Sequence, residues 1–72
     1  MTFTELLFYN DEFCFIYQSV KYWIISENEK RCIYEESTNK LIGEYSSNDD
    51  LLNTAIIKGQ KLTDILEKIE VI

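Results

Sequence analysis

Residues 13–25 have the sequence FCFIYQSVKYWII, and this stretch decides the fold of the chain. From Phe13 the side chains alternate between two faces, with residues 13, 15 and 17 on one face and residues 14 and 16 on the other. Gln18-Ser19 is a turn, after which aromatic and β-branched residues continue to Ile25. This composition and period predict a β-hairpin.

Two more strands are expected C-terminal to this hairpin, at residues 31–35 and 41–45, after polar turns at 26–30 and 37–40. Short connections join antiparallel neighbours, so the four strands form an antiparallel meander. Gly43 inside the last strand predicts a β-bulge or a close approach to the backbone, with a bulky ring as one candidate.

Helical signals lie on both sides of the strands. Thr2 and Glu5 have the spacing of a capping box that starts a short helix over residues 3–10. Ser47 is the expected N-cap of a second helix, because acidic residues follow it and suit the positive end of a helix dipole. Lys58-Gly59 is the expected end of that helix.

A third, amphipathic helix is predicted over residues 62–69, where apolar residues recur at helical spacing. Residues 70–72 follow it as a tail that can pack against the sheet. The sequence therefore predicts a single α+β domain over residues 1–72. It has a short N-terminal helix, a four-stranded antiparallel β-meander and two C-terminal helices packed on one sheet face.

Composition excludes several kinds of chemistry. The chain has 72 residues, 13 acidic against 7 basic side chains, a formal charge of -6 and no histidine. Histidine-dependent nucleophiles and most zinc sites are therefore excluded, and the acidic balance disfavours direct nucleic-acid binding. Two glycines are too few for a phosphate-cradling loop. We predict no catalytic residue, no cofactor and no metal ligand, and we do not expect an enzyme.

The N-terminal segment has neither the basic region nor the small-residue cleavage site of a signal peptide. Apolar runs such as Tyr22 to Ile25 are far shorter than the roughly 20 residues of a membrane span. We therefore expect a cytoplasmic protein that does not bind membranes, with Cys14 and Cys32 reduced. Whether these two cysteines pair is left open by the sequence.

Both faces of the second strand are apolar, because Tyr22 and Ile24 alternate with Trp23 and Ile25. Helices can cover only one face of so small a sheet. On the other face, either the rings pack laterally with their polar tips in water, or they form an interface with a second copy or a partner protein. Base stacking is a third, weaker alternative, because glutamates surround the sheet. The candidate interface residues are Phe15, Tyr17, Tyr22, Trp23 and Tyr34.

The hairpin at 13–25, the strand IYEE at 33–36, the segment DDLL at 49–52 and the segment at 56–65 cover nearly the whole chain. In these segments the chain resembles small uncharacterised proteins of low-GC Gram-positive bacteria and their phages or mobile elements. The resemblance implies a small α+β fold without an assigned activity. It also implies a mobile-element origin, where small acidic proteins often bind host proteins.

The predicted function is a non-enzymatic cytoplasmic protein–protein interaction module, which acts as a homodimer or on a host protein through an aromatic sheet face. The alternative is an acidic mimic of nucleic acid that inhibits a DNA- or RNA-binding enzyme of the host. The formal charge of -6 motivates this alternative.

Overall fold

The helix α1, Phe3–Tyr9, begins the fold in the computed structural model, which describes residues 2–72. The predicted capping box is present. The Glu5 amide donates to Thr2 Oγ1 at 3.2 Å, and the Thr2 amide donates to Glu5 Oε1 at 2.9 Å. These bonds satisfy amide groups that the first helical turn leaves unpaired, and the bond from the Thr2 amide is the main cause that lowers the pKa of Glu5.

The predicted meander follows as four strands. They are β1 (Phe13–Tyr17), β2 (Val20–Glu27), β3 (Lys30–Glu35) and β4 (Lys40–Tyr45). The first two turns, Gln18-Ser19 and Asn28-Glu29, contain two residues each, all with φ between 50° and 65°. Such turns match the twist of the flanking strands. The strands β2 and β3 therefore extend into residues 26–30, which the sequence pattern assigns to a longer turn.

The sheet has five strands in the order β4-β3-β2-β1-β7, and each pairing is antiparallel. The fifth strand is β7, Glu70–Val71, which pairs with Phe15 and Ile16 of β1. The prediction of four strands was therefore wrong. The tail forms backbone hydrogen bonds with β1 because the free edge of that strand offers unpaired N–H and C=O groups.

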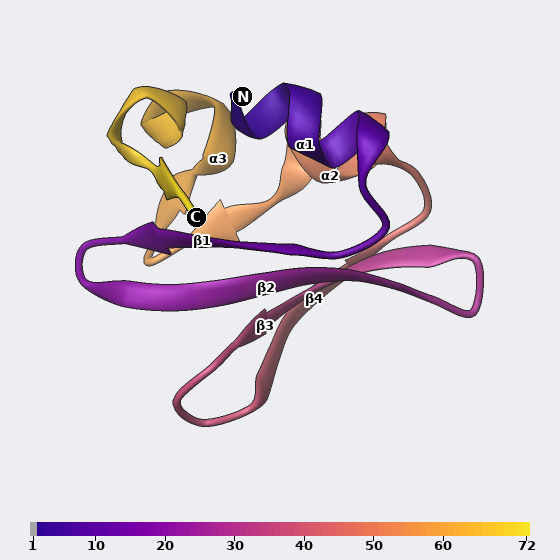
Figure 1. Ribbon diagram of the computed structural model, residues 1–72, viewed down its shortest axis with the longest axis horizontal. Helices are drawn as coiled ribbons and strands as arrows, with labels where there is room; N and C mark the ends of the chain where they lie inside the picture. The colour runs from indigo at the N-terminus through magenta and orange to yellow at the C-terminus, as the bar shows by residue number, and fades with distance from the viewer. Residues whose placement is uncertain (1) are drawn as a thin grey trace.

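All three helices lie on the same side of this sheet (Figure 1). The helix α2, Asn48–Thr54, begins as predicted, since Ser47 Oγ accepts a hydrogen bond from the Asp50 amide at 3.0 Å. It ends before the predicted stop at Lys58-Gly59, and Ala55 is its C-cap.

A two-stranded hairpin replaces the expected last turn of α2. Its strands are β5 (Ile56–Ile57) and β6 (Gln60–Lys61), and Lys58 and Gly59 form its turn with φ of 52° and 78°. The β-branched pair favours an extended backbone. This conformation buries Ile57 completely and leaves Ile56 54% exposed.

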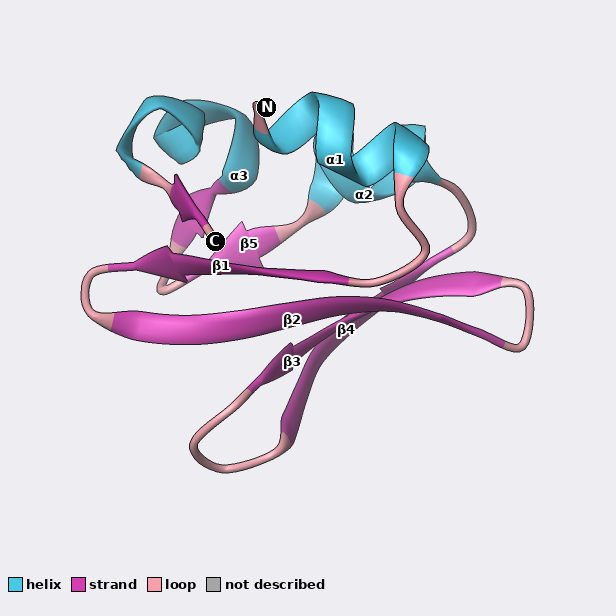
Figure 2. Ribbon diagram, viewed as in Figure 1, coloured by secondary structure: helices cyan, strands magenta, loops and turns pink. Residues whose placement is uncertain are grey.

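The C-terminal segment is less helical than predicted. The helix α3 covers Leu62–Ile65, and a short 3-10 helix, η1, covers Leu66–Lys68 (Figure 2). No side chain caps the start of α3 at Lys61, and Ile69 already has an extended backbone. Pairing of β7 with β1 therefore ends the helical segment early.

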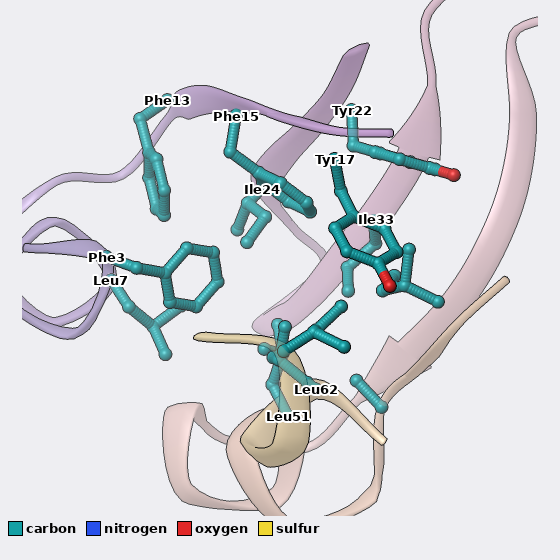
Figure 3. Packing of buried hydrophobic residues seen from close by; sticks show 13 residues of the cluster. Phe3, Leu7, Phe13, Phe15, Tyr17, Tyr22, Ile24, Ile33, Leu51 and Leu62 are labelled. Atoms are coloured by element: carbon teal, nitrogen blue, oxygen red, sulfur yellow. The ribbon is translucent and has the colours of Figure 1, made fainter. Parts of the chain in front are cut away.

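The hydrophobic core lies between the sheet and the helices (Figure 3). Phe3 of α1 packs edge-on against Phe13 and Phe15 of β1, with ring centroids 5.5 Å and 5.3 Å apart. Phe15 also stacks on Tyr22 of β2 at 5.2 Å. Leu51 of α2 closes the core from the helical side and is fully buried.

Gly43 is a position of close approach, as predicted. The register between β3 and β4 shifts between Ile33 and Tyr34, so that Ile33 pairs with Gly43 while Tyr34 pairs with Leu41. A Cβ atom built on Gly43 would lie 2.7 Å from Cζ of Tyr45 and still closer to its hydroxyl oxygen. The tyrosine ring therefore lies against the glycine backbone.

Arg31, the only arginine of the sequence, is buried on the helical side of β3. Its five hydrogen bonds use all the N–H donors of a guanidinium. The acceptors are the carbonyl oxygens of Leu7 (2.9 Å), Asn10 (3.1 Å) and Asp11 (2.7 Å), Ser26 Oγ (2.7 Å) and Asn48 Oδ1 (2.9 Å). Burial lowers the pKa of Arg31, and the nearby Asp11 carboxylate opposes this shift.

Candidate interaction surface

The face of the five-stranded sheet that points away from the helices is the candidate functional surface. We call it the open face, because α1, α2 and α3 all lie on the opposite side (Figure 1). Strand register places the following residues on it: Cys14, Ile16, Lys21, Trp23, Ile25, Glu27, Lys30, Cys32, Tyr34, Leu41, Glu44 and Glu70. The side chain of Glu36, just after β3, contacts the same face.

A row of apolar side chains crosses four strands of the open face. Trp23 pairs with Cys14 on one side and with Tyr34 on the other, and Tyr34 pairs with Leu41. Cys14 is 8% exposed and Leu41 is 43% exposed, whereas both aromatic residues of the row are partly buried. Cross-strand aromatic neighbours of this kind pack against each other and stabilise a sheet.

Two charged side chains surround the ring of Trp23. Its Nε1 donates to Glu36 Oε1 at 2.9 Å, and Lys21 Nζ lies 5.5 Å from the ring centroid. The same ammonium group lies 3.5 Å from Glu36 Oε1. The Trp23 hydrogen bond, followed by the Lys21 charge, lowers the pKa of Glu36, so its carboxylate is ionised at neutral pH.

Tyr34 has a similar arrangement at the other end of the aromatic pair. Its hydroxyl donates to Glu27 Oε1 at 2.8 Å. This hydrogen bond is the main cause that raises the pKa of Tyr34 to about 12, because ionised Tyr34 would face a carboxylate instead of donating to it. The polar atom of each ring thus has a hydrogen-bond partner within the chain, and these bonds fix the orientation of the two rings.

The structure divides the five candidate residues between the two faces. Trp23 and Tyr34 lie on the open face. Phe15, Tyr17 and Tyr22 are at most 3% exposed and point into the core between the sheet and the helices (Figure 3). The physical reason is strand alternation: Phe15 and Tyr17 share a face, and Tyr22 lies opposite Phe15 on that face. These three residues are therefore not part of the open face.

The two cysteines are free thiols on different strands of the open face. Cys14 is on β1 and Cys32 on β3, with β2 between them, so their Cα atoms are roughly 10 Å apart, too far for a disulfide. Burial, followed by the charges of Glu44 and Glu27, raises the pKa of Cys32. A thiol in this environment is a poor nucleophile.

The residues that hold the two rings in place were not predicted from the sequence. Glu27, Glu36 and Lys21 become recognisable once the register is known. The two-residue turn at Gln18-Ser19 fixes that register, because it pairs Tyr17 with Val20 and therefore Cys14 with Trp23. Glu36 follows Tyr34 by two residues, which is the spacing of side chains on the same face of a strand.

Residues 2–72 contain no pocket and no group of three side chains suited to a metal ion. In the same range, no helix is long and apolar enough to cross a membrane. The predicted lack of catalysis, cofactor and metal stays a prediction.

Comparison with known proteins adds no assignment, since no family model, curated protein or solved structure matches the chain. The resemblance to small proteins of Gram-positive bacteria, phages and mobile elements also stays a prediction.

Proposed function

We propose that this chain is a non-enzymatic, cytoplasmic protein–protein interaction module that binds a partner protein through the open face. One observation carries this proposal: the apolar row through Trp23 and Tyr34 crosses the sheet on the side that no helix covers. Tryptophan and tyrosine are enriched at the centres of interfaces, where each can contribute about 2 kcal/mol or more to binding.

The row is also preorganised for binding. Glu36 holds the indole of Trp23, and Glu27 holds the hydroxyl of Tyr34, so neither ring has to be ordered when a partner arrives. Ordering a mobile side chain costs about 0.5–1.5 kcal/mol on association. Leu41, which is 43% exposed at the edge strand β4, extends the apolar contact area.

Site-specific photo-crosslinking in the cells that produce the protein tests this proposal. A benzoylphenylalanine at Leu41 is expected to form a covalent adduct with a discrete partner. The matched control has the same residue at Ile56, which is similarly exposed but belongs to β5 near the helices. Adduct formation at Leu41 should also be lost when Trp23 is replaced by alanine.

Equal crosslinking from Leu41 and Ile56, or adducts that survive Trp23→Ala, would contradict the proposal. Circular dichroism of each variant separates loss of binding from loss of folding. Adducts that survive Trp23→Ala would instead favour the acidic nucleic-acid mimic, because such an inhibitor binds through carboxylates and does not need the aromatic row.

A further inference from the structure

The two glutamates that hold the aromatic pair have acceptor capacity left over. An ionised carboxylate offers about four lone-pair sites. Glu36 uses one oxygen, Oε1, for both Trp23 and Lys21, and Glu27 accepts a hydrogen bond from Tyr34 and also lies beside the Cys32 thiol. Both glutamates are exposed. Their remaining acceptor sites therefore face the solvent beside an apolar surface.

The two carboxylates lie at opposite ends of the aromatic pair. Trp23 and Tyr34 are direct cross-strand partners, so their Cβ atoms are about 5 Å apart. Glu36 follows Tyr34 in the direction of the chain, whereas Glu27 lies at the other end, next to the turn between β2 and β3. A carboxylate therefore lies at each end of the apolar pair, and each has a lysine nearby: Lys21 lies 3.5 Å from Glu36, and Lys30 is the cross-strand partner of Glu27.

The open face as a whole is also negatively charged. It contains four glutamates (Glu27, Glu36, Glu44 and Glu70) and two lysines (Lys21 and Lys30), which leaves a formal charge of -2. A second copy would oppose an identical acidic face, and each chain has a formal charge of -6. Like charges across an interface oppose association, so face-to-face pairing of two copies is disfavoured.

We infer that the open face binds a basic protein segment that presents arginine or lysine side chains on both sides of an apolar residue. This inference rests on the proposed function and specifies the chemistry of its partner. The apolar residue packs on Trp23 and Tyr34, and the two basic side chains pair with Glu27 and Glu36. Arginine fits best, because its guanidinium stacks on an aromatic ring while it pairs with a carboxylate.

Selection from a library of random peptides displayed on yeast tests the inference with a defined probe. The library is sorted for binding to the intact chain, and clones that also bind the Trp23→Ala variant are removed. Peptides that depend on the open face are expected to be enriched in arginine and lysine on both sides of an apolar residue. Their affinity should fall as the salt concentration rises.

Substitution of the two glutamates tests the proposed pairs directly. Glu27→Gln with Glu36→Gln keeps an acceptor for each ring but removes both charges. It should weaken binding of the selected peptides by about tenfold or more. The matched control, Asp64→Asn with Glu67→Gln, changes the net charge equally within α3 and η1 and should leave the affinity within about twofold.

The outcomes separate this inference from the proposed function. If the selected peptides need Trp23 but are neutral or acidic, the open face is a binding surface and the basic partner is wrong. If no peptide depends on Trp23, both proposals fail. Light scattering after size exclusion measures the oligomeric state and so tests whether a second copy of the chain binds the open face instead. A dimer of the intact chain that Leu41→Lys converts to a monomer would show that a second copy binds the open face.

Discussion

Arg31 donates a hydrogen bond from Nη2 to the carbonyl oxygen of Leu7 at 2.9 Å, across a sequence separation of 24 residues. Leu7 lies in the last turn of α1, where carbonyl groups lack partners within the helix. The guanidinium charge also suits the negative end of the helix dipole. Because the same group binds the carbonyls of Asn10 and Asp11, one strand residue fixes both the helix end and the connection to β1.

Arg31→Met is expected to lower the free energy of unfolding by about 3 kcal/mol, because it removes five hydrogen bonds and leaves one buried and four part-buried acceptors unpaired. Arg31→Lys should cost about 2 kcal/mol, since an ammonium group has three donors and cannot reproduce the planar fork. Urea denaturation followed by circular dichroism measures both. Lys68→Met is the surface control. A similar loss of unfolding free energy in that variant would show that the hydrogen bonds of Arg31 do not account for the effect.

Gly43→Ala is expected to lower the free energy of unfolding by about 1–3 kcal/mol, because the new methyl group would overlap the ring of Tyr45. In a Tyr45→Ala background the same change should be neutral or slightly stabilising, since an alanine restricts the unfolded chain more than a glycine does. A double-mutant cycle by urea denaturation gives the coupling energy. Additive effects would show that the ring does not restrict this position.

The turn between β2 and β3 carries Glu29 with a φ of 64°, a conformation that costs a residue with a side chain about 1 kcal/mol. Glu29→Gly should therefore raise the free energy of unfolding by about 0.5–1 kcal/mol, because Asn-Gly is the preferred pair for such a turn. Gly59→Ala is the reverse change, at a φ of 78°, and should destabilise by about 1 kcal/mol. Thermal unfolding measures both changes. If both variants gain stability, or both lose it, this account is contradicted.

The predictable and unpredictable parts of the fold differ in the range of the interactions that determine them. The capping residues Thr2 and Ser47 and the alternation from Phe13 to Ile25 are local signals, and the structure confirms them. The small hairpin at Lys58-Gly59 was missed because the same two residues can end a helix or turn a hairpin. Burial of Ile57 by distant residues decides between the two.

The candidate surface was predictable only in part, for a related reason. Alternation separates Trp23 from Tyr22 on opposite faces, but it does not say which face the helices cover. That choice depends on where α1 and α2 pack, and hence on contacts such as those of Phe3 with Phe13 and Phe15. The burial of Arg31 likewise depends on acceptors from α1, β2 and α2 that converge only in the folded chain.

Trp23, the only tryptophan, should report the ionisation of Glu36 through its fluorescence. The pKa of Glu36 in the folded chain is below its ordinary value of 4.5, chiefly because Trp23 donates to the ionised form. The stabilisation is therefore present above about pH 4.5 and is lost as the pH falls through the lower, folded-state pKa. Glu36→Gln should abolish this acid transition in emission. The same transition in the glutamine variant would assign it to another group.

Tyr34 is expected to remain protonated in alkaline solution, because its pKa is raised to about 12 by the hydrogen bond to Glu27. A raised pKa favours the neutral form, so the linked stability is complete below about pH 10 and is lost as the pH rises through about 12. NMR of the Tyr34 ring measures the titration directly. Glu27→Gln should move the midpoint down toward 10, since the carboxylate that contributes most no longer opposes tyrosinate. Glu44→Gln removes a charge that contributes least, so a larger shift in that variant than in Glu27→Gln would contradict the assignment.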